Sequence, residues 1–392
     1  MIQRDYLIVG AGIAGASVCE TIRKCDRRGS VMLVGSESFA PYNRPHLFKS
    51  YLTRVAAPPE KLLHLKPDWY AANKVDLRLE TTVTELNLDR HIAVLATGQA
   101  VEFRKACLAM GSRARKPAVA GANLGNVIYV RTIRDVMSLR EISGGEKNVV
   151  VIGGGFIAAE TASLLRQLKL TVRLMSRHPT LWQKMLDEES AQWLTEYFAK
   201  RGVSMMMQET LNGFEGKTVL KNIQTKSGNR FSAGMALVAV GGEPNLDLVA
   251  DTPLSSPNGT PVNEYLETDE KGIYAAGDIA LYPDRILGGM RRTEHWENAL
   301  TQGRTVGGNI TGKKRQKFES VPHNASELFD LKFEFVGDFS APPARAEIEG
   351  DRAKKRFVAR YYRGEELRGI VLCNQEPSAA PAARKALRDA AR

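Results

Sequence analysis

Short apolar runs followed by glycine-rich turns recur along the 392-residue chain. Near the N-terminus, an apolar run at 6–9 precedes a glycine turn, a helical pattern over 16–23 and a second apolar run at 31–34. Uninterrupted apolar runs of this length are typical of strands buried on both faces of a parallel sheet. The pattern therefore predicts a strand–turn–helix–strand unit at the start of the chain.

A second unit of the same kind begins 143 positions later. An apolar run at 148–152 leads into another glycine turn, a helical pattern to about 169 and a strand-like run at 170–175. The run 236–240 predicts a further parallel strand. Two copies at this spacing predict an α/β protein with two doubly wound dinucleotide-binding domains.

The pattern changes from about residue 320 onward. Shorter alternating runs, such as 332–336 and 356–361, are typical of antiparallel strands, and 379–391 is predicted to be the last helix. These elements indicate a small α+β domain at the C-terminal end. We expect a first nucleotide domain in two parts, a second one inserted into it and a C-terminal domain, with boundaries 1–112, 113–243, 244–318 and 319–392.

The first glycine turn has the residue types that bind a pyrophosphate. Gly10 permits a tight turn, Gly12 lets a pyrophosphate approach the backbone, and Gly15 allows close packing of helix and strand. The unpaired N–H groups of the helix N-terminus favour an anion there. Glu37, after the next strand, can accept hydrogen bonds from a ribose diol. The alternative is a glycine turn that serves packing alone.

The second turn differs from the first in two informative ways. Ala158 replaces the third glycine after Gly153 and Gly155, and the acidic position after the second strand reads Ser176-Arg177-His178. A carboxylate would repel a 2′-phosphate, whereas a guanidinium matches phosphate oxygens bidentately. We therefore expect this site to accept NADPH at least as well as NADH. In the alternative interpretation, Arg177 is a solvated surface charge.

Charge and cysteine usage narrow the remaining possibilities. With 55 Lys and Arg against 44 Asp and Glu, the net charge is +11, and the segment 313–317 carries four of the positive charges. Such an excess fits an acidic protein partner, an anionic surface, nucleic acid or simple solubility. We find no nucleic-acid motif and no apolar stretch long enough for a membrane span. The four cysteines form no recognisable pair or metal pattern, so a reducing, cytoplasmic compartment is expected and no metal site is predicted.

The two turns, the segment 42–49 and the segment 272–278 together resemble a known family. They are similar to the FAD-dependent pyridine nucleotide oxidoreductases, and more narrowly to the ferredoxin reductases of oxygenase systems and the apoptosis-inducing factor relatives. The likeness runs from residue 1 to about 320 and continues weakly to about 375.

The resemblance implies a seat for FAD, residue by residue. Asp278 would bond the ribityl chain, Trp296 would neighbour the flavin and Glu294 would contact the nicotinamide. A helix N-terminus near Trp296 would stabilise negative charge at flavin N1 and O2. The full set implied for FAD is Gly10, Gly12, Ala14, Gly15, Glu37, Arg44, Lys49, Arg113, Gly277, Asp278, Glu294, His295 and Trp296.

The resemblance also implies groups for hydride transfer and for the nicotinamide nucleotide. Lys49 would pair with Glu160 beside flavin N5, and Phe156 would cover the flavin face that receives the nicotinamide. Spacing alone would favour two separate surface charges for Lys49 and Glu160, and a core aromatic is the alternative for Phe156. The nucleotide would lie on Gly153, Gly155, Ala158, Ser176, Arg177 and Gly241.

Two departures from the family are visible. No cysteine stands near Lys49, so thiol chemistry beside the flavin is not expected. The Trp that the family carries early in its C-terminal domain is absent, and Ala325 is the best match to its position. We therefore expect a more open flavin.

The expected function is an FAD-dependent NAD(P)H oxidoreductase that passes electrons to a one-electron protein acceptor, such as an acidic ferredoxin or rubredoxin. The alternatives are an apoptosis-inducing-factor-like NAD(P)H oxidase or quinone reductase, and a redox-regulated flavoprotein. A monomer or a homodimer is expected.

Overall fold

A computed structural model describes residues 1–47, 52 and 58–391. Lys49, for which the sequence analysis predicts two roles, lies outside the described residues. The chain forms two compact units, each assembled from separate stretches of sequence. Unit 1 consists of residues 1–44, 58–113 and 243–320, and unit 2 of residues 45–57, 114–242 and 321–392.

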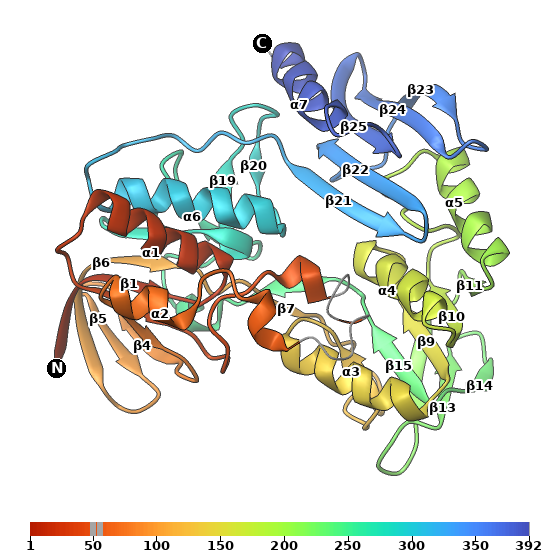
Figure 1. Ribbon diagram of the computed structural model, residues 1–392, viewed down its shortest axis with the longest axis horizontal. Helices are drawn as coiled ribbons and strands as arrows, with labels where there is room; N and C mark the ends of the chain where they lie inside the picture. Colours follow the sequence, from red (N-terminus) through yellow and green to blue (C-terminus); the bar gives the residue numbers. More distant parts are fainter. Residues whose placement is uncertain (48–51, 53–57, 392) are drawn as a thin grey trace. The chain divides into compact units, whose positions relative to one another are not determined.

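Unit 1 is built on a seven-stranded sheet whose first half is parallel (Figure 1). Strands β1, β2 and β3 run side by side, and β1 also pairs in parallel with β6. β2 is a four-residue strand with all side chains buried, as the apolar run predicts. The strands are β1 (Ile2–Val9), β2 (Val31–Val34), β3 (Val75–Arg78), β4 (Val83–Asn87), β5 (Ile92–Leu95), β6 (Ala100–Leu108) and β18 (Ile273–Ala275).

The sheet of unit 1 branches along β6. The first residues of β6 pair with the antiparallel β4–β5 hairpin, whereas Ala106 to Leu108 pair in parallel with β18. β18 therefore delivers the turn at Gly277 to the same sheet edge as the turn after β1, because carboxyl ends of parallel strands meet at one edge.

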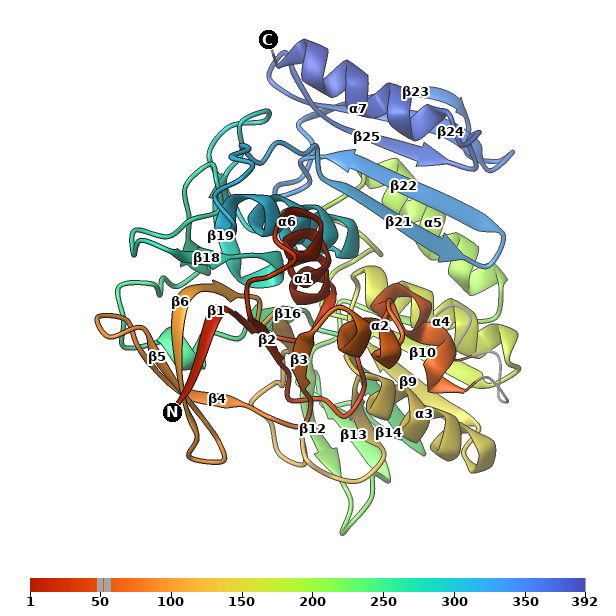
Figure 2. The ribbon, with the colours of Figure 1, turned by 60° about the vertical axis from the view of Figure 1, so that its left-hand side comes forward.

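Helices α1 (Ile13–Cys25) and α6 (Trp296–Ile310) lie side by side in unit 1 (Figures 1 and 2). Two glycines of α6 make this approach possible. A Cβ at Gly303 would lie 2.4 Å from the carbonyl oxygen of Ala14, and one at Gly307 would lie 2.5 Å from Cβ of Thr21. The remaining elements are α2 (Pro67–Ala72), η3 (Pro59–Leu62), η4 (Asp247–Val249), η5 (Gly277–Ile279), β17 (Thr260–Pro261), β19 (Ala280–Pro283) and β20 (Met290–Arg291).

Unit 2 contains a second parallel sheet, in the order β11-β10-β9-β15-β8. Its strands are β8 (Val127–Tyr129), β9 (Asn148–Ile152), β10 (Thr171–Ser176), β11 (Ser204–Met207) and β15 (Met235–Val238). Its helices are α3 (Ile133–Gly145), α4 (Phe156–Gln167) and α5 (Glu188–Lys200), and a small antiparallel sheet holds β12 (Leu211–Glu215), β13 (Asn222–Thr225) and β14 (Arg230–Ser232). The short elements η1 (Arg44–His46), β7 (Ser112–Ala114) and β16 (Gly242–Pro244) span points where the chain passes between the units.

The C-terminal part of unit 2 is a five-stranded antiparallel sheet with one helix, α7 (Ala379–Ala390), packed on it (Figure 1). Its order is β21-β22-β25-β24-β23. The strands are β21 (His323–Leu328), β22 (Leu331–Gly337), β23 (Arg345–Asp351), β24 (Arg356–Arg363) and β25 (Glu366–Cys373).

Aromatic side chains fill the space beneath this C-terminal sheet. The ring of Trp182, which is 1% exposed, packs within 5.2 Å of the rings of Phe333 and Phe335. Edge-to-face contacts of this kind stabilise a core beyond their buried area. The backbone N–H of Trp182 donates to the carbonyl of Gly154 in the glycine turn of unit 2. The C-terminal sheet and this turn therefore share one core.

Polar contacts hold α5 to the same sheet at both of its ends. At the N-terminal end, Asp187 accepts hydrogen bonds from Tyr361 and Arg352. Just past the other end, Arg201 pairs with Asp330. Although burial acts in the opposite direction, hydrogen bonds from Lys355 and Tyr197 lower the pKa of Asp330 to about 2.

The predicted fold class is confirmed: two doubly wound α/β sheets and a small α+β part are present. The boundaries 1–112, 113–243, 244–318 and 319–392 stay a prediction. Among the residues described, no helix is both long and apolar enough to cross a membrane.

We predict that Gly303→Ala lowers the free energy of unfolding by about 1–3 kcal/mol, because the added methyl group meets the Ala14 carbonyl. Chemical denaturation of the purified protein measures the change. Gly144→Ala is the matched control, since it lies in a helix with no atom within 4 Å of the added Cβ. Equal stabilities of Gly303→Ala and the control would contradict the close approach of α1 and α6.

Candidate functional site: two dinucleotide turns

The first glycine turn joins β1 to α1 and leaves its middle glycine open. Gly10 has φ +115°, and a Cβ there would lie 2.1 Å from the carbonyl oxygen of Ala109. A Cβ on Gly15 would lie 2.1 Å from the carbonyl oxygen of Gly10. Gly12, the N-cap of α1, has no atom within 4 Å of its added Cβ. The turn is thus packed tightly behind and open where a pyrophosphate would approach.

The second turn repeats this geometry. Gly153 has φ +139°, and its added Cβ would lie 2.2 Å from the carbonyl oxygen of Ala239. Gly155, the N-cap of α4, is open in the same way as Gly12. Ala158 is fully buried at the position of the third glycine, so this helix leaves room for one methyl group.

The same backbone hydrogen bonds also occur at the strand ends of both units. Gly10 donates to the carbonyl of Val34, and Gly153 donates to that of Met175. Val34 therefore corresponds to Met175, and the next residues correspond in order: Gly35 to Ser176, Ser36 to Arg177, and Glu37 to His178. One further bond occurs in both units: the N–H of Glu80 donates to the carbonyl of Glu37, and the N–H of Gln208 donates to that of His178, both donors having positive φ.

This register makes His178 the residue that corresponds to Glu37, whereas the sequence analysis gave a role only to Ser176 and Arg177 within the run Ser176-Arg177-His178. Comparing the two strands from their glycine turns would have found it. Burial and the neighbouring charges of Arg177 and Lys184 lower the pKa of His178. Arg177 Nε lies 3.4 Å from Nε2 of His178, while Ser176 is buried with its Oγ accepting the His178 N–H. Arg177 and Lys184 supply positive charge suited to a phosphate, and the lowered pKa of His178 beside them favours its neutral imidazole.

Glu37 is held in place by two neighbours on its own unit. Tyr42 donates to one carboxylate oxygen at 2.7 Å, and Arg44 pairs with the other. Arg44 in turn donates to the Tyr42 hydroxyl and lies over its ring. Two predicted residues, Glu37 and Arg44, are thus brought together beyond the end of β2.

Asp278 lies in a turn fixed from two sides. Its carboxylate accepts a 2.6 Å hydrogen bond from the buried Ser112 hydroxyl, a partner far away in sequence. Gly277, with φ +79°, donates its N–H to Oε1 of Gln302. Ser112 and Gln302 are site residues that sequence reasoning missed, and no local signal marks them.

The N-terminus of α6 carries the next group of predicted residues. His295 is the N-cap and accepts from the Glu297 N–H, and Trp296 is the first helical residue. Glu294 is exposed and pairs with Arg292, which also donates to the carbonyl of Asp278. This helix end therefore lies in the same cluster as the Asp278 turn.

Other predicted residues lie elsewhere in their units. Arg113 pairs with Glu243 and Asp247. Ala14 is buried in the first turn of α1, where its carbonyl limits the space beside Gly303. Gly241 has φ +109° and open space at its Cβ, beyond the end of β15.

Phe156 is the first residue of α4 and packs against the aromatic core of unit 2. Its ring lies 5.2 Å from that of Trp182 and 4.9 Å from that of Phe335. Glu160 stands one turn further along α4 and is partly buried. The predicted partner of Glu160, Lys49, lies outside the described residues.

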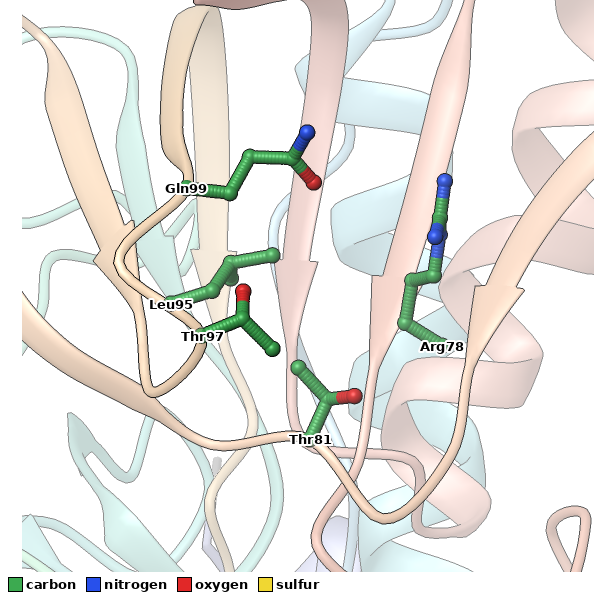
Figure 3. A pocket seen from close by; sticks show the side chains of 5 residues that line it. All are labelled: Arg78, Thr81, Leu95, Thr97 and Gln99. Atoms are coloured by element: carbon green, nitrogen blue, oxygen red, sulfur yellow. The ribbon is translucent and has the colours of Figure 1, made fainter.

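A shallow pocket of about 350 Å³ lies in unit 1 at the end of β3 (Figure 3). Its lining consists of Arg78, Thr81, Leu95, Thr97 and Gln99. None of the residues predicted to bind a cofactor lines it. We therefore build the candidate site on the glycine turns and not on this pocket.

The cysteines contribute no redox centre to the site. All four are free, and Cys19, Cys107 and Cys373 are buried. Burial raises the pKa of Cys19 and of Cys373 to about 12, which leaves both as thiols.

The residues of unit 1 fit FAD. The open Gly12 backbone can receive a pyrophosphate, and Glu37 is preorganised at the ribose position. The indole Nε1 of Trp296 and the Nε2 of Gln302 are buried donors without a hydrogen-bond partner among the described residues. A buried donor without a partner is costly, so these two atoms are consistent with an acceptor supplied by a ligand.

Comparison with known proteins agrees with this geometry. Benzene 1,2-dioxygenase system ferredoxin–NAD(+) reductase subunit of Pseudomonas putida is 30% identical over 335 residues, 86% of this chain and 81% of that protein. Monodehydroascorbate reductase of Pisum sativum is 28% identical over 357 residues, covering 85% and 82%. The solved covalent putidaredoxin reductase–putidaredoxin complex matches with a TM-score of 0.93 at 28% identity, covering 99% of this chain and 94% of that one.

The family described as pyridine nucleotide-disulphide oxidoreductase matches residues 4–303. FAD and a reduced pyridine nucleotide are the cofactors of this family, in accord with the two turns. The chain therefore belongs to the pyridine nucleotide-disulphide oxidoreductase family and is an oxidoreductase.

Proposed function

We propose that the protein takes a hydride from NADPH or NADH and passes electrons, one at a time, to an acidic iron–sulfur protein such as a ferredoxin or rubredoxin. The observation that carries this proposal is the pair of matching dinucleotide turns, the first completed by the Asp278 turn and the α6 N-terminus. When bound, FAD supplies the exchange between a two-electron donor and a one-electron acceptor. We also propose a reducing, cytoplasmic compartment, because all four cysteines are free.

The chain's own residues bind and orient the two nucleotides in this proposal. The N-terminal turns of α1 and α4 hold the pyrophosphates with backbone N–H groups. Glu37 binds the adenosine ribose of FAD, and the Ser112–Asp278 pair holds the ribityl chain. The N-terminus of α6, capped by His295, favours negative charge at the pyrimidine end of the flavin. That Lys49, Glu160 and Phe156 lie beside the flavin stays a prediction.

A small-molecule acceptor is the second candidate. Ala325, the best match to the position of the family's Trp, is exposed on β21. An exposed alanine leaves more room for a small oxidant than an indole would. A quinone, oxygen or monodehydroascorbate, the compound in the name of the relative from Pisum sativum, would fit this alternative.

Steady-state rates of the purified holoenzyme with NADPH separate the two candidates. We expect an acidic ferredoxin or rubredoxin to be reduced at least about tenfold faster than quinone, oxygen or monodehydroascorbate, with equal acceptor concentrations. Faster reduction of any small acceptor would favour the second candidate and contradict the first.

We propose that the second turn binds NADPH through Arg177, His178 and Lys184. His178→Glu recreates the carboxylate of the first turn, so we predict that KM for NADPH rises at least about tenfold while KM for NADH falls. Arg177→Gln should raise KM for NADPH alone, and Lys217→Gln on the same unit, with the same change of charge, should alter neither. A wild-type kcat/KM tenfold higher for NADH than for NADPH would contradict this proposal.

The cations beyond α6 stand apart from the proposed flavin seat. Lys313 and Lys314 follow the C-terminal end of α6, and Trp296 stands at its other end, about 22 Å away for a helix of 15 residues. Arg315 lies over the ring of Tyr265, and Lys317 pairs with Glu264. This position suits long-range steering of an acidic partner and not the contact through which electrons pass.

We predict that reversing Lys313, Lys314 and Arg315 to Glu raises KM for an acidic protein acceptor severalfold at about 10 mM salt, where the screening length is about 30 Å. The effect should vanish at about 150 mM salt, where that length is about 8 Å. NADPH oxidation by ferricyanide is the control and should not change. An unaltered KM at low salt would mean that these cations are a solvated surface, and an effect that persists at high salt would indicate direct contact.

A further inference from the structure

Gln302 lies where three segments of unit 1 meet. It is fully buried on α6, beside the first turn of α1 and the turn at Gly277. Little free space remains around it, since an added Cβ on the adjacent Gly303 would lie 2.4 Å from the Ala14 carbonyl oxygen. An added Cβ on Gly277 would lie 3.2 Å from Cβ of Ala14. The side chain of Gln302 is therefore confined between segments that the proposed FAD seat uses.

One half of the Gln302 amide has a partner, and this fixes the orientation of the group. Oε1 accepts the Gly277 N–H at 2.8 Å. The flipped amide would place its NH₂ group against that N–H, so the network assigns Oε1 to this side. Nε2 consequently points to another side of the junction.

The other half of the amide has no partner in the part of the chain that the structure describes. Nε2 of Gln302 is buried and makes no hydrogen bond there. An amide donor left this way in a protein interior is unfavourable, and such groups are rare in native structures. An acceptor that arrives with a ligand would remove the deficit.

Two acceptors are close enough in the fold to be considered. The first acceptor is a phosphate oxygen of FAD. Ala14 stands in the helix turn whose free N–H groups face the proposed pyrophosphate position, and Gly277 directly precedes Asp278. The hydroxyl of Ser17 is the other, because it is also buried without a partner and α1 places Ser17 against Gly303. A water shared by Ser17 and Gln302 would satisfy both groups without FAD.

We propose that Gln302 is a positioning residue for FAD. Its Oε1 holds the Gly277 turn, and its Nε2 donates, directly or through one ordered water, to a phosphate oxygen of the cofactor. This inference rests on the proposed FAD seat and adds to it a donor from α6, a helix that the glycine motif does not include. Gln302 thereby links cofactor binding to the turn that carries Asp278.

Gln302→Glu separates the two halves of the amide, because it keeps an acceptor for Gly277 and removes the donor. We expect the dissociation constant of the apoprotein for FAD, measured by quenching of flavin fluorescence, to rise at least about tenfold at pH 8. It should recover toward the wild-type value as the pH falls and the carboxyl group regains a proton that it can donate. The thermal midpoint of the apoprotein, measured at the same pH values, shows whether the variant is folded where FAD binding is lost.

Matched variants make the result specific. Gln316→Glu places the same charge on an exposed residue beyond α6 and should bind FAD as the wild type does. Ser17→Ala removes the competing acceptor and should also leave FAD binding unchanged. An affinity of Gln302→Glu within twofold of the wild type would overturn the proposal. So would an equal loss in Ser17→Ala together with a pH-independent loss in Gln302→Glu, which would indicate a shared internal water.

Two further measurements cover the remaining outcomes. Gly15→Ala forces a methyl group against the Gly10 carbonyl, and undiminished FAD binding by this variant would contradict the seat itself and not Gln302 alone. If Gln302→Glu does not fold as an apoprotein, the side-chain amide of wild-type Gln302 can be followed by ¹⁵N NMR with selective glutamine labelling. Its N–H signals should shift when FAD is added, and unshifted signals would overturn the proposal.

Discussion

Both nucleotide units depend on one close contact, between the first glycine of the turn and the carbonyl of a neighbouring strand segment. Gly10 meets Ala109 in this way, and Gly153 meets Ala239. Because a hydrogen atom stands where every other residue has a Cβ, the helix can begin directly at the sheet edge. The free N–H groups of that helix then face the edge where the strand ends meet. The placement of Glu37, His178 and the Asp278 turn follows from this geometry.

The arginines and lysines of the chain fall into two groups: those paired with acidic residues in the C-terminal sheet and those beyond α6. In the C-terminal sheet, many cations are committed to neighbours: Arg352 to Asp187 and Glu189, Lys355 to Asp330, and Arg368 to Asp338. These contacts fasten the sheet to α5 and to its own loops. These three cations therefore have a structural role. The cations beyond α6 keep more of their charge available to a partner.

Much of the fold could be predicted from the sequence because its strands are short apolar runs ended by glycine turns. The strands β2 and β9 have the bounds that their apolar runs indicate. The site was predicted less completely. Ser112 and Gln302 reach Asp278 and Gly277 through the tertiary fold, so nothing local marks them. His178 was not singled out within the run Ser176-Arg177-His178, because the residue equivalent to Glu37 is set by a backbone hydrogen bond at the end of β10, which residue types alone do not reveal.

In both units, one residue of the glycine turn packs against one residue at the end of the next strand. The side chain of this pair comes from the turn in the first unit and from the strand end in the second. In the first unit Ala11 occupies a space that would otherwise meet a Cβ on Gly35, 2.3 Å away. In the second unit the small residue is Gly154, and Ser176 fills the space from the strand side. In each unit, therefore, the residue that carries a side chain stands opposite a glycine. A methyl group added at Gly154 would displace the Ser176 hydroxyl, which accepts the His178 N–H, so the second turn and the position of His178 are set together.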